Sequence, residues 1–115
     1  METKEFKFHG KGIRFATIND HVMVNASDMA SAFDANVYLF FSTSIFQNLF
    51  DALSKEKAFA DPDSLVTTDD NKNFWIYRAI AYKYAEIFTA EFEVWVYTHV
   101  DEYNKARFSD LALMN

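Results

Sequence analysis

The sequence predicts one small α+β domain, and three observations carry that prediction. Apolar and polar residues alternate with a period of two through the N-terminal segment, which is typical of strands. The segment 44–57 instead places its apolar side chains on one helical face. Residues 65–68 and 74–77 are two short apolar or β-branched runs joined by a polar loop, and they predict a β-hairpin ahead of further helices.

Length and composition limit the domain organisation. A chain of 115 residues can bury one apolar core but not two. We therefore expect a single domain over residues 1–115, with a core from about 6 to 104 and a short C-terminal tail at 107–115. The chain contains 13 Phe and 6 Tyr but only 2 Gly and 1 Pro, which predicts a packed globule. So many aromatic residues exceed what one small core is expected to hide, and we expect the excess in an exposed patch or a subunit interface, with a homodimer favoured.

Cysteine usage and hydropathy indicate the compartment. The chain has no cysteine, which excludes a disulfide framework and a thiolate metal site and favours a reducing cytoplasm. The sequence shows neither a secretory signal pattern nor an apolar run near the ~20 residues that span a bilayer. We therefore expect no membrane partner.

The first strands follow from alternation and glycine. Residues 6–8 and 13–15 each carry aromatic or aliphatic side chains at alternate positions. Gly10 and Gly12 mark the bend between these two runs. The sequence thus predicts an N-terminal antiparallel pair.

A third strand and a short helix come next. The Asn-Asp pair at 19–20 predicts a tight turn into a strand at 22–24. Asn25 is a good N-cap, and Asp28 favours the positive end of the helix that would follow. We expect this helix over residues 26–33.

The clearest amphipathic helix is expected over residues 44–57. Ser44 and Gln47 form a capping-box pattern at its start. Before it, the apolar run 37–41 is either a buried strand-like segment or the start of the next helix, and periodicity does not separate these. The apolar face of the helix consists of Ile45, Phe46, Leu49, Phe50 and Leu53.

The predicted hairpin and two C-terminal helices complete the fold. The strands at 65–68 and 74–77 enclose the loop 69–73, and helices are expected over 78–87 and 89–106. Order and type together predict a small α+β domain of winged-helix-like character: N-terminal antiparallel strands, helix-turn-helix-like helices, a β-hairpin and C-terminal helices. The residues expected to be buried by the C-terminal helices are Ile80, Tyr84, Ile87, Phe92, Trp95, Val96, His99, Val100 and Tyr103.

One stretch of sequence also resembles a known family. Residues 74–85 read FWIYRAIAYKYA, and residues 88–96 read FTAEFEVWV. Together with the N-terminal segments 13–15 and 22–30, they resemble the KilA-N domain, collinearly over about residues 6–104. That family is a DNA-binding-type module of bacteriophages, large DNA viruses and bacterial mobile elements, and it is related to the fungal APSES domain.

The resemblance implies a regulatory DNA-binding protein of phage or mobile-element origin, located in the cytoplasm of a bacterial host cell. It also implies that the hairpin is a wing that contacts DNA. No enzymatic activity and no cofactor are expected from it.

The first DNA-binding candidates lie on the helix from residue 44. Gln47 and Asn48 are near its N-terminus, and such side chains can hydrogen-bond adenine bidentately in a major groove. In the alternative, Gln47 completes a cap and Asn48 is only solvated. Asp51, one turn further along, has the wrong sign to meet a phosphate.

The hairpin tip supplies the next candidates. Asn71, Lys72 and Asn73 suit contacts to the DNA backbone. Asp69 and Asp70 precede them and oppose such contacts by their charge.

Cationic residues elsewhere are the last candidates. Arg78 and Lys83 begin the next helix and are candidate phosphate contacts beside the wing, although Arg78 is equally suited to pair with a wing aspartate. The N-terminal strands offer another basic group, either for phosphate contact or as a charged sheet edge that discourages aggregation. This group consists of Lys4, Lys7, Lys11 and Arg14.

The overall charge opposes DNA binding. The formal net charge is −6, and in residues 15–70 two lysines face nine carboxylates, a net of −7. A duplex binder gains much of its affinity by neutralising phosphates with clustered Lys and Arg. The alternative function is therefore an acidic protein-interaction module on the same scaffold, which binds a host factor or mimics DNA.

No catalytic or metal-binding constellation is apparent. His9, His21 and His99 lie far apart, and none has the i+4 histidine or cysteine of a metal site. The aspartates between residues 61 and 70 lack the spacing, Gly and Glu of a calcium loop. Neither a phosphate-cradling glycine loop nor a nucleophile elbow occurs. We expect no enzyme, no metal and no cofactor.

Overall fold

The computed structural model describes the backbone of residues 1–113 and the side chains of residues 1–107. Its centre is a five-stranded antiparallel sheet in the order β1-β2-β3-β5-β4, which confirms the predicted α+β class. The strands are β1 (Thr3–Phe8), β2 (Lys11–Ile18), β3 (His21–Asn25), β4 (Val66–Thr68) and β5 (Phe74–Tyr77).

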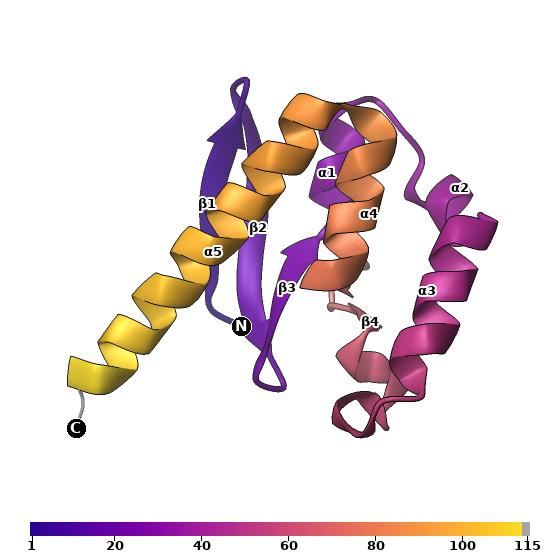
Figure 1. The fold of residues 1–115 in the computed structure, drawn as a ribbon. Helices are drawn as coiled ribbons and strands as arrows, with labels where there is room; N and C mark the ends of the chain where they lie inside the picture. The colour runs from indigo at the N-terminus through magenta and orange to yellow at the C-terminus, as the bar shows by residue number, and fades with distance from the viewer. Residues whose placement is uncertain (114–115) are drawn as a thin grey trace.

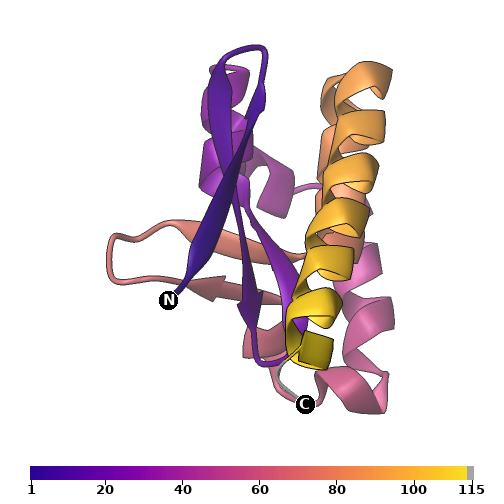
Figure 2. The same cartoon turned by 90° about the vertical axis from the view of Figure 1, so that its left-hand side faces the viewer.

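Helices cover the sheet unevenly. Three of them connect β3 to β4, and two follow β5. Figures 1 and 2 show α4 and α5 against one face of the sheet, while the hairpin of β4 and β5 projects on the opposite side. The helices are α1 (Ala26–Ala32), α2 (Val37–Phe41), α3 (Ser44–Ser54), α4 (Arg78–Phe88) and α5 (Ala90–Leu113), with two 3-10 turns, η1 (Lys57–Phe59) and η2 (Pro62–Ser64).

Two tight turns build the N-terminal meander. His9 and Gly10 join β1 to β2 with φ angles of 48° and 80°. Asn19 and Asp20 join β2 to β3 with φ angles of 52° and 65°, as the Asn-Asp pair predicted. Two-residue hairpin loops favour left-handed backbone at both positions because this twist matches that of the strands.

The cap of α1 is also confirmed. The Asn25 side chain is buried, and its Oδ1 accepts a hydrogen bond of 2.8 Å from the Asp28 backbone N–H. The helix ends at Ala32, one residue short of the predicted end, and Phe33 is its C-cap.

The apolar run at 37–41 is a separate short helix, α2, rather than a strand. Asn36 caps it by accepting from the Tyr38 backbone N–H at 3.0 Å. Its last residue, Phe41, stands only two residues before Thr43. The chain therefore turns between α2 and α3 within a few residues.

This turn makes the predicted capping box wrong. Thr43, not Ser44, has the extended backbone of an N-cap, and its Oγ1 accepts from the Phe46 N–H at 3.2 Å. Gln47 instead donates through Nε2 to the Phe41 carbonyl at 3.4 Å. The helix also ends at Ser54 rather than 57, because the chain then enters η1.

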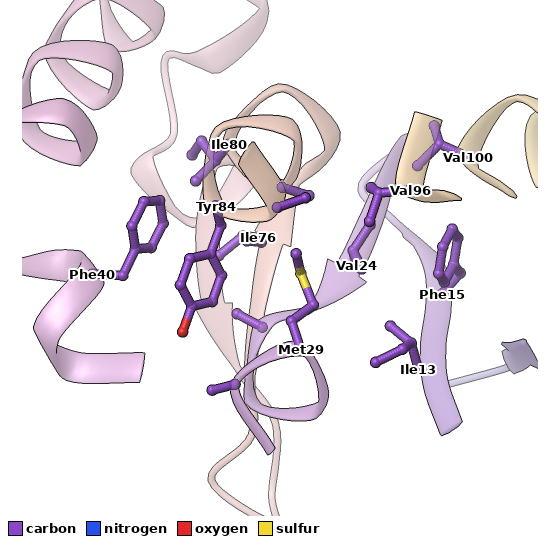
Figure 3. Close-up of a cluster of buried hydrophobic side chains, with 14 of the residues drawn as sticks. Ile13, Phe15, Val24, Met29, Phe40, Ile76, Ile80, Tyr84, Val96 and Val100 are labelled. Atoms are coloured by element: carbon purple, nitrogen blue, oxygen red, sulfur yellow. The ribbon is translucent and has the colours of Figure 1, made fainter. Parts of the chain in front are cut away.

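The main core lies between the sheet and the helices, and Figure 3 shows part of it. The prediction that Ile87 is buried is wrong, since its side chain is 47% exposed. The inward stripe of α4 runs through Ile80 and Tyr84, and Phe88 continues it with the i+4 spacing of one helical face. Phe88 stacks on Phe33 with ring centroids 4.4 Å apart.

The last helix is longer than predicted. α5 continues to Leu113, so residues 107–113 of the expected tail prolong the helix, and residues 114–115 lie outside the described part. Within the described residues, no helix combines the length and apolarity that crossing a membrane requires.

Candidate nucleic-acid interface

The wing loop joins β4 to β5 and is organised around one carboxylate. Asp69 Oδ1 accepts hydrogen bonds from the backbone N–H groups of Asn71 and Asn73, at 2.9 and 3.0 Å. The Lys72 N–H donates to the Asp69 carbonyl at 2.9 Å, and Lys72 adopts a left-handed φ of 63°. The loop therefore presents Asn71, Lys72 and Asn73 in one defined arrangement.

A polar network continues from the loop into the sheet. Asp69 Oδ2 accepts from the indole Nε1 of Trp75 at 3.0 Å, and this bond holds the pKa of Asp69 below its ordinary value. The guanidinium of Arg14 lies over the Trp75 ring, 6.0 Å from its centroid. Arg14 in turn donates to both carboxylate oxygens of Asp28, from Nε at 2.8 Å and from Nη2 at 3.0 Å. These bonds are the largest cause of the raised pKa of Arg14.

This network decides the role of Arg14 within the N-terminal basic group. Its guanidinium is engaged by Asp28, so Arg14 supports the base of the wing from β2. Lys7 pairs with Glu5 at 2.9 Å, and Lys4 lies over the Phe6 ring at 5.3 Å. The N-terminal lysines lie on the β1–β2 pair, and β1 is an edge strand of the sheet. Phosphate contact and a charged sheet edge both stay predictions for them.

The short helix α2 links the wing to α3. The Phe74 ring, at the start of β5, contacts Tyr38 and Phe41 with centroid distances of 5.4 and 5.0 Å. The Phe74 N–H donates to Ser27 Oγ of α1 at 3.0 Å. Gln47 is hydrogen-bonded to the Phe41 carbonyl, so α2 contacts both the base of the wing and the N-terminus of α3.

The predicted DNA-binding residues fall into two groups. Asn71, Lys72 and Asn73 form the wing tip, and Gln47 and Asn48 are exposed near the start of α3. The two groups lie apart, because α3 packs against α4 while the hairpin projects on the opposite side of the sheet (Figure 2). Between them, α2 contacts both the wing base and α3.

Arg78 and Lys83 lie elsewhere. Arg78 follows β5 at the end opposite the wing tip, about 13 Å along the strand. Its guanidinium lies 5.7 Å from the Tyr77 ring centroid and lines a cavity of about 280 Å³ with Asp20, His21 and Asn104 among others. Lys83 pairs with Glu86 on the exposed side of α4, at 3.6 Å.

This placement settles the alternative partner proposed for Arg78. The Asp69 carboxylate accepts a hydrogen bond from the Trp75 indole. Its negative charge also raises the pKa of the nearby Arg14. Arg78 is therefore not the partner of Asp69.

Two exposed residues at the base of the wing are not among the predicted site residues. Tyr38 and Leu39 of α2 are 64% and 68% exposed beside the wing base. Residues 35–50 contain no charged side chain, a signal that is visible in the sequence. What the sequence did not reveal is that Tyr38 and Leu39 of this stretch are exposed at the base of the wing.

The acidic residues of the middle segment are spread around the domain. Asp51 is exposed one turn past Gln47, while Asp61 and Asp63 belong to the η2 turn beyond the C-terminal end of α3. Asp28 and Asp69 are engaged by the network at the wing base. In the part of the chain that the structure describes, no group of three His, Cys, Asp or Glu residues is placed to hold a metal ion.

The aromatic residues mostly pack against one another in the interior. Among the described side chains, Tyr38 and Tyr97 are the large aromatic residues that stand exposed. Tyr97 stacks on Tyr82 with centroids 3.9 Å apart. Only these two of the described aromatic side chains are therefore left to form an exposed interface, and the homodimer stays a prediction.

Helices α1 to α3 followed by a projecting hairpin, all built on an antiparallel sheet, define a winged-helix-like α+β domain. The chain belongs to the KilA-N domain family, whose model matches residues 7–106. KilA-N is a DNA-binding-type family rather than an enzymatic one. No curated protein matches the chain, and no solved structure does either.

Proposed function

We propose that the protein binds duplex DNA through a surface formed by the wing loop, α2 and the N-terminus of α3. The observation that carries this proposal is the wing loop, in which hydrogen bonds to Asp69 hold Lys72 and its two flanking asparagines in one arrangement. Membership of a DNA-binding-type family supports it. The proposal includes a regulatory role in a phage or mobile element and action in the cytoplasm of a bacterial host.

Each part of the surface has a distinct role. Lys72 contacts a phosphate, and the two wing asparagines hydrogen-bond the DNA backbone. Gln47 and Asn48 contact base edges in the major groove, where an amide can pair with adenine. Arg78 and Lys83 reach phosphates only if the duplex extends past the far end of β5.

The net charge of −6 limits the expected affinity. Few cations are available to release counterions from DNA, so binding should be weak and restricted to low salt. The uncharged stretch 35–50 removes repulsion from the centre of the surface but adds no attraction.

The second candidate function is an acidic protein-interaction module. Exposed Tyr38 and Leu39 favour it, because aromatic and aliphatic side chains on an uncharged surface are typical of the centre of a protein interface. The partner would be a host factor, or a DNA-binding protein whose DNA groove is occupied by the acidic surface in place of DNA.

The test is binding of random-sequence duplex DNA, titrated with salt from ~20 mM, where screening is weak. We expect binding that weakens as salt rises and that falls further in Lys72→Glu. Lys105→Glu is the matched control, since it makes the same charge change on α5, where Lys105 pairs with Asp101.

Arg78→Glu then shows whether the duplex reaches the far end of β5. If Lys72→Glu and Lys105→Glu lowered the DNA affinity equally, the change in overall charge alone would explain the loss. That result would contradict the proposed surface. An absence of wild-type binding at the lowest salt would favour the protein-interaction function.

A further inference from the structure

The wing contains two adjacent aspartates with different surroundings. The Asp69 carboxylate accepts from two backbone N–H groups of the loop and from the Trp75 indole. Asp70 is exposed, and its side chain makes no hydrogen bond or ion pair with the described residues. The two residues carry the same charge at nearly the same place, but only one is built into the structure.

The bonds to Asp69 hold the loop in a conformation that its sequence does not favour. Lys72 has a φ of 63°, in the left-handed region that residues with a Cβ rarely adopt. The Asp69 N–H also donates to the Asn73 carbonyl at 3.1 Å, which closes the loop on its other side. An amide in place of the carboxylate has one acceptor oxygen and a donor NH2, so it cannot serve both the loop and the indole.

The indole connects this loop to the rest of the domain. Trp75 is 1% exposed, with its N–H directed to Asp69 and its ring face to Arg14. Asp28 fixes Arg14 through two hydrogen bonds from the start of α1. The orientation of the wing tip is thereby tied to β2 and α1.

We infer that Asp69 is the positioning residue of the wing, and that its carboxylate orients Lys72 and the flanking asparagines toward a phosphate backbone. This role rests on the proposed DNA binding. An acidic residue that would repel DNA as a bare charge here strengthens binding, because the hydrogen bonds it accepts fix the cation beside it.

The inference predicts opposite signs for two neighbouring substitutions. Asp70→Asn removes one negative charge near a phosphate and should tighten binding by about twofold, the screened Coulomb effect in water. Asp69→Asn removes the same charge and should weaken binding by roughly fivefold or more, because one oriented charged contact is lost. Tightening by similar factors in both variants would overturn the inference.

A salt titration shows whether Asp69 acts through Lys72. In the wild type, Lys72→Gln should lower the slope of log affinity against log salt by about one, as expected for one lost phosphate contact. In the Asp69→Asn background the same substitution should leave the slope nearly unchanged. An undiminished effect of Lys72→Gln in that background would overturn the inference.

A measurement without DNA separates the geometry from the proposed function. The Trp75 indole N–H resonance should move upfield in Asp69→Asn and stay in place in Asp70→Asn, with Trp95 as the internal reference in the same spectrum. An unmoved Trp75 signal overturns the geometry itself. If the signal moves but the wild type binds no duplex at low salt, the proposed function and this role in it both fail, while the hydrogen bond stands.

Discussion

The two ends of the domain are held together by different forces. Where α5 crosses β1 and β2, the contacts are aromatic: Phe92 stacks on Trp95 at 5.6 Å, and Phe8 packs against both rings at 4.8 and 5.5 Å. At the wing, the contacts that fix the loop are hydrogen bonds to Asp69 and the Arg14–Asp28 pair. Apolar packing stabilises without strong directional preference, whereas hydrogen bonds specify an orientation.

The strand lengths explain this division. β4 has three residues and β5 has four, so the hairpin buries little apolar surface of its own. A short hairpin is marginally stable in isolation and depends on the elements that support it. The wing should therefore respond to the loss of single polar groups, and the α5 end to the loss of buried volume.

The largest effect is expected at the aromatic end. Phe92→Ala removes a fully buried ring and should destabilise the fold by about 3–5 kcal/mol. Chemical denaturation measures this as a loss of unfolding free energy. A cost below about 1 kcal/mol, too small for a buried ring, would show that the aromatic cluster is not the main support.

A smaller effect should follow at the wing base. Asp28→Asn leaves the Arg14 guanidinium without its carboxylate, and Arg14 retains about a third of its side-chain exposure. We expect a cost of about 2 kcal/mol, the range for hydrogen bonds to charged groups, reduced by solvent screening.

The local consequence of Asp28→Asn distinguishes the two ends. Amide hydrogen exchange should accelerate more at the wing than in α5, because Arg14 supports the Trp75 ring of β5. Equal acceleration at both ends would mean that the network does not act on the wing specifically.

The start of α3 gives a third prediction. Thr43→Ala deletes the hydroxyl that accepts from Phe46 N–H and should cost about 1 kcal/mol. Ser44→Ala, next to it, is the matched control and should change the unfolding free energy little. A larger loss of unfolding free energy in Ser44→Ala than in Thr43→Ala would show that Ser44 is the N-cap, as the predicted capping box required.

The smallest effect is expected at Tyr84. Its hydroxyl is buried without a hydrogen-bond partner among the described residues, so Tyr84→Phe should be neutral or stabilise by up to about 1 kcal/mol. Thermal unfolding of the two proteins at neutral pH measures the difference. Destabilisation by more than that would indicate a partner for the hydroxyl.

The same residue carries a pH dependence. Burial raises the pKa of Tyr84 to about 12, above the ordinary value of about 10. The folded state therefore favours the neutral phenol, and this contribution is present below pH ~10 and is lost between pH ~10 and the folded-state pKa. Wild-type stability should fall more steeply over that window than Tyr84→Phe stability, and parallel curves would contradict the burial.

Local sequence signals predicted the strands, the 19–20 turn, the Asn25 cap and the hairpin. Each of these depends on neighbours within a few residues. The predictions that failed depend on tertiary context. Thr43 and Ser44 are adjacent hydroxyl residues, and only the end of α2 decides which one has the N-cap backbone.

The candidate site was predicted in part. The wing-tip residues and Gln47 and Asn48 could be chosen from their positions in expected elements, and whether they touch DNA stays a prediction. The Arg14–Asp28 pair spans fourteen positions of the chain and needed the register of the sheet. The hydrogen bonds of Asp69 had a local signal, because Asp often accepts from the backbone two residues on in a turn.

The proposed DNA-binding surface can be mapped by the backbone amide chemical shifts that change when a random-sequence duplex is added at low salt. We expect shifts in the wing loop 69–73, in α2 and at the start of α3, with α5 unchanged. Shifts confined to the exposed side of α4 and α5, around Ile87 and Tyr97, would contradict it and place the binding surface at the aromatic end.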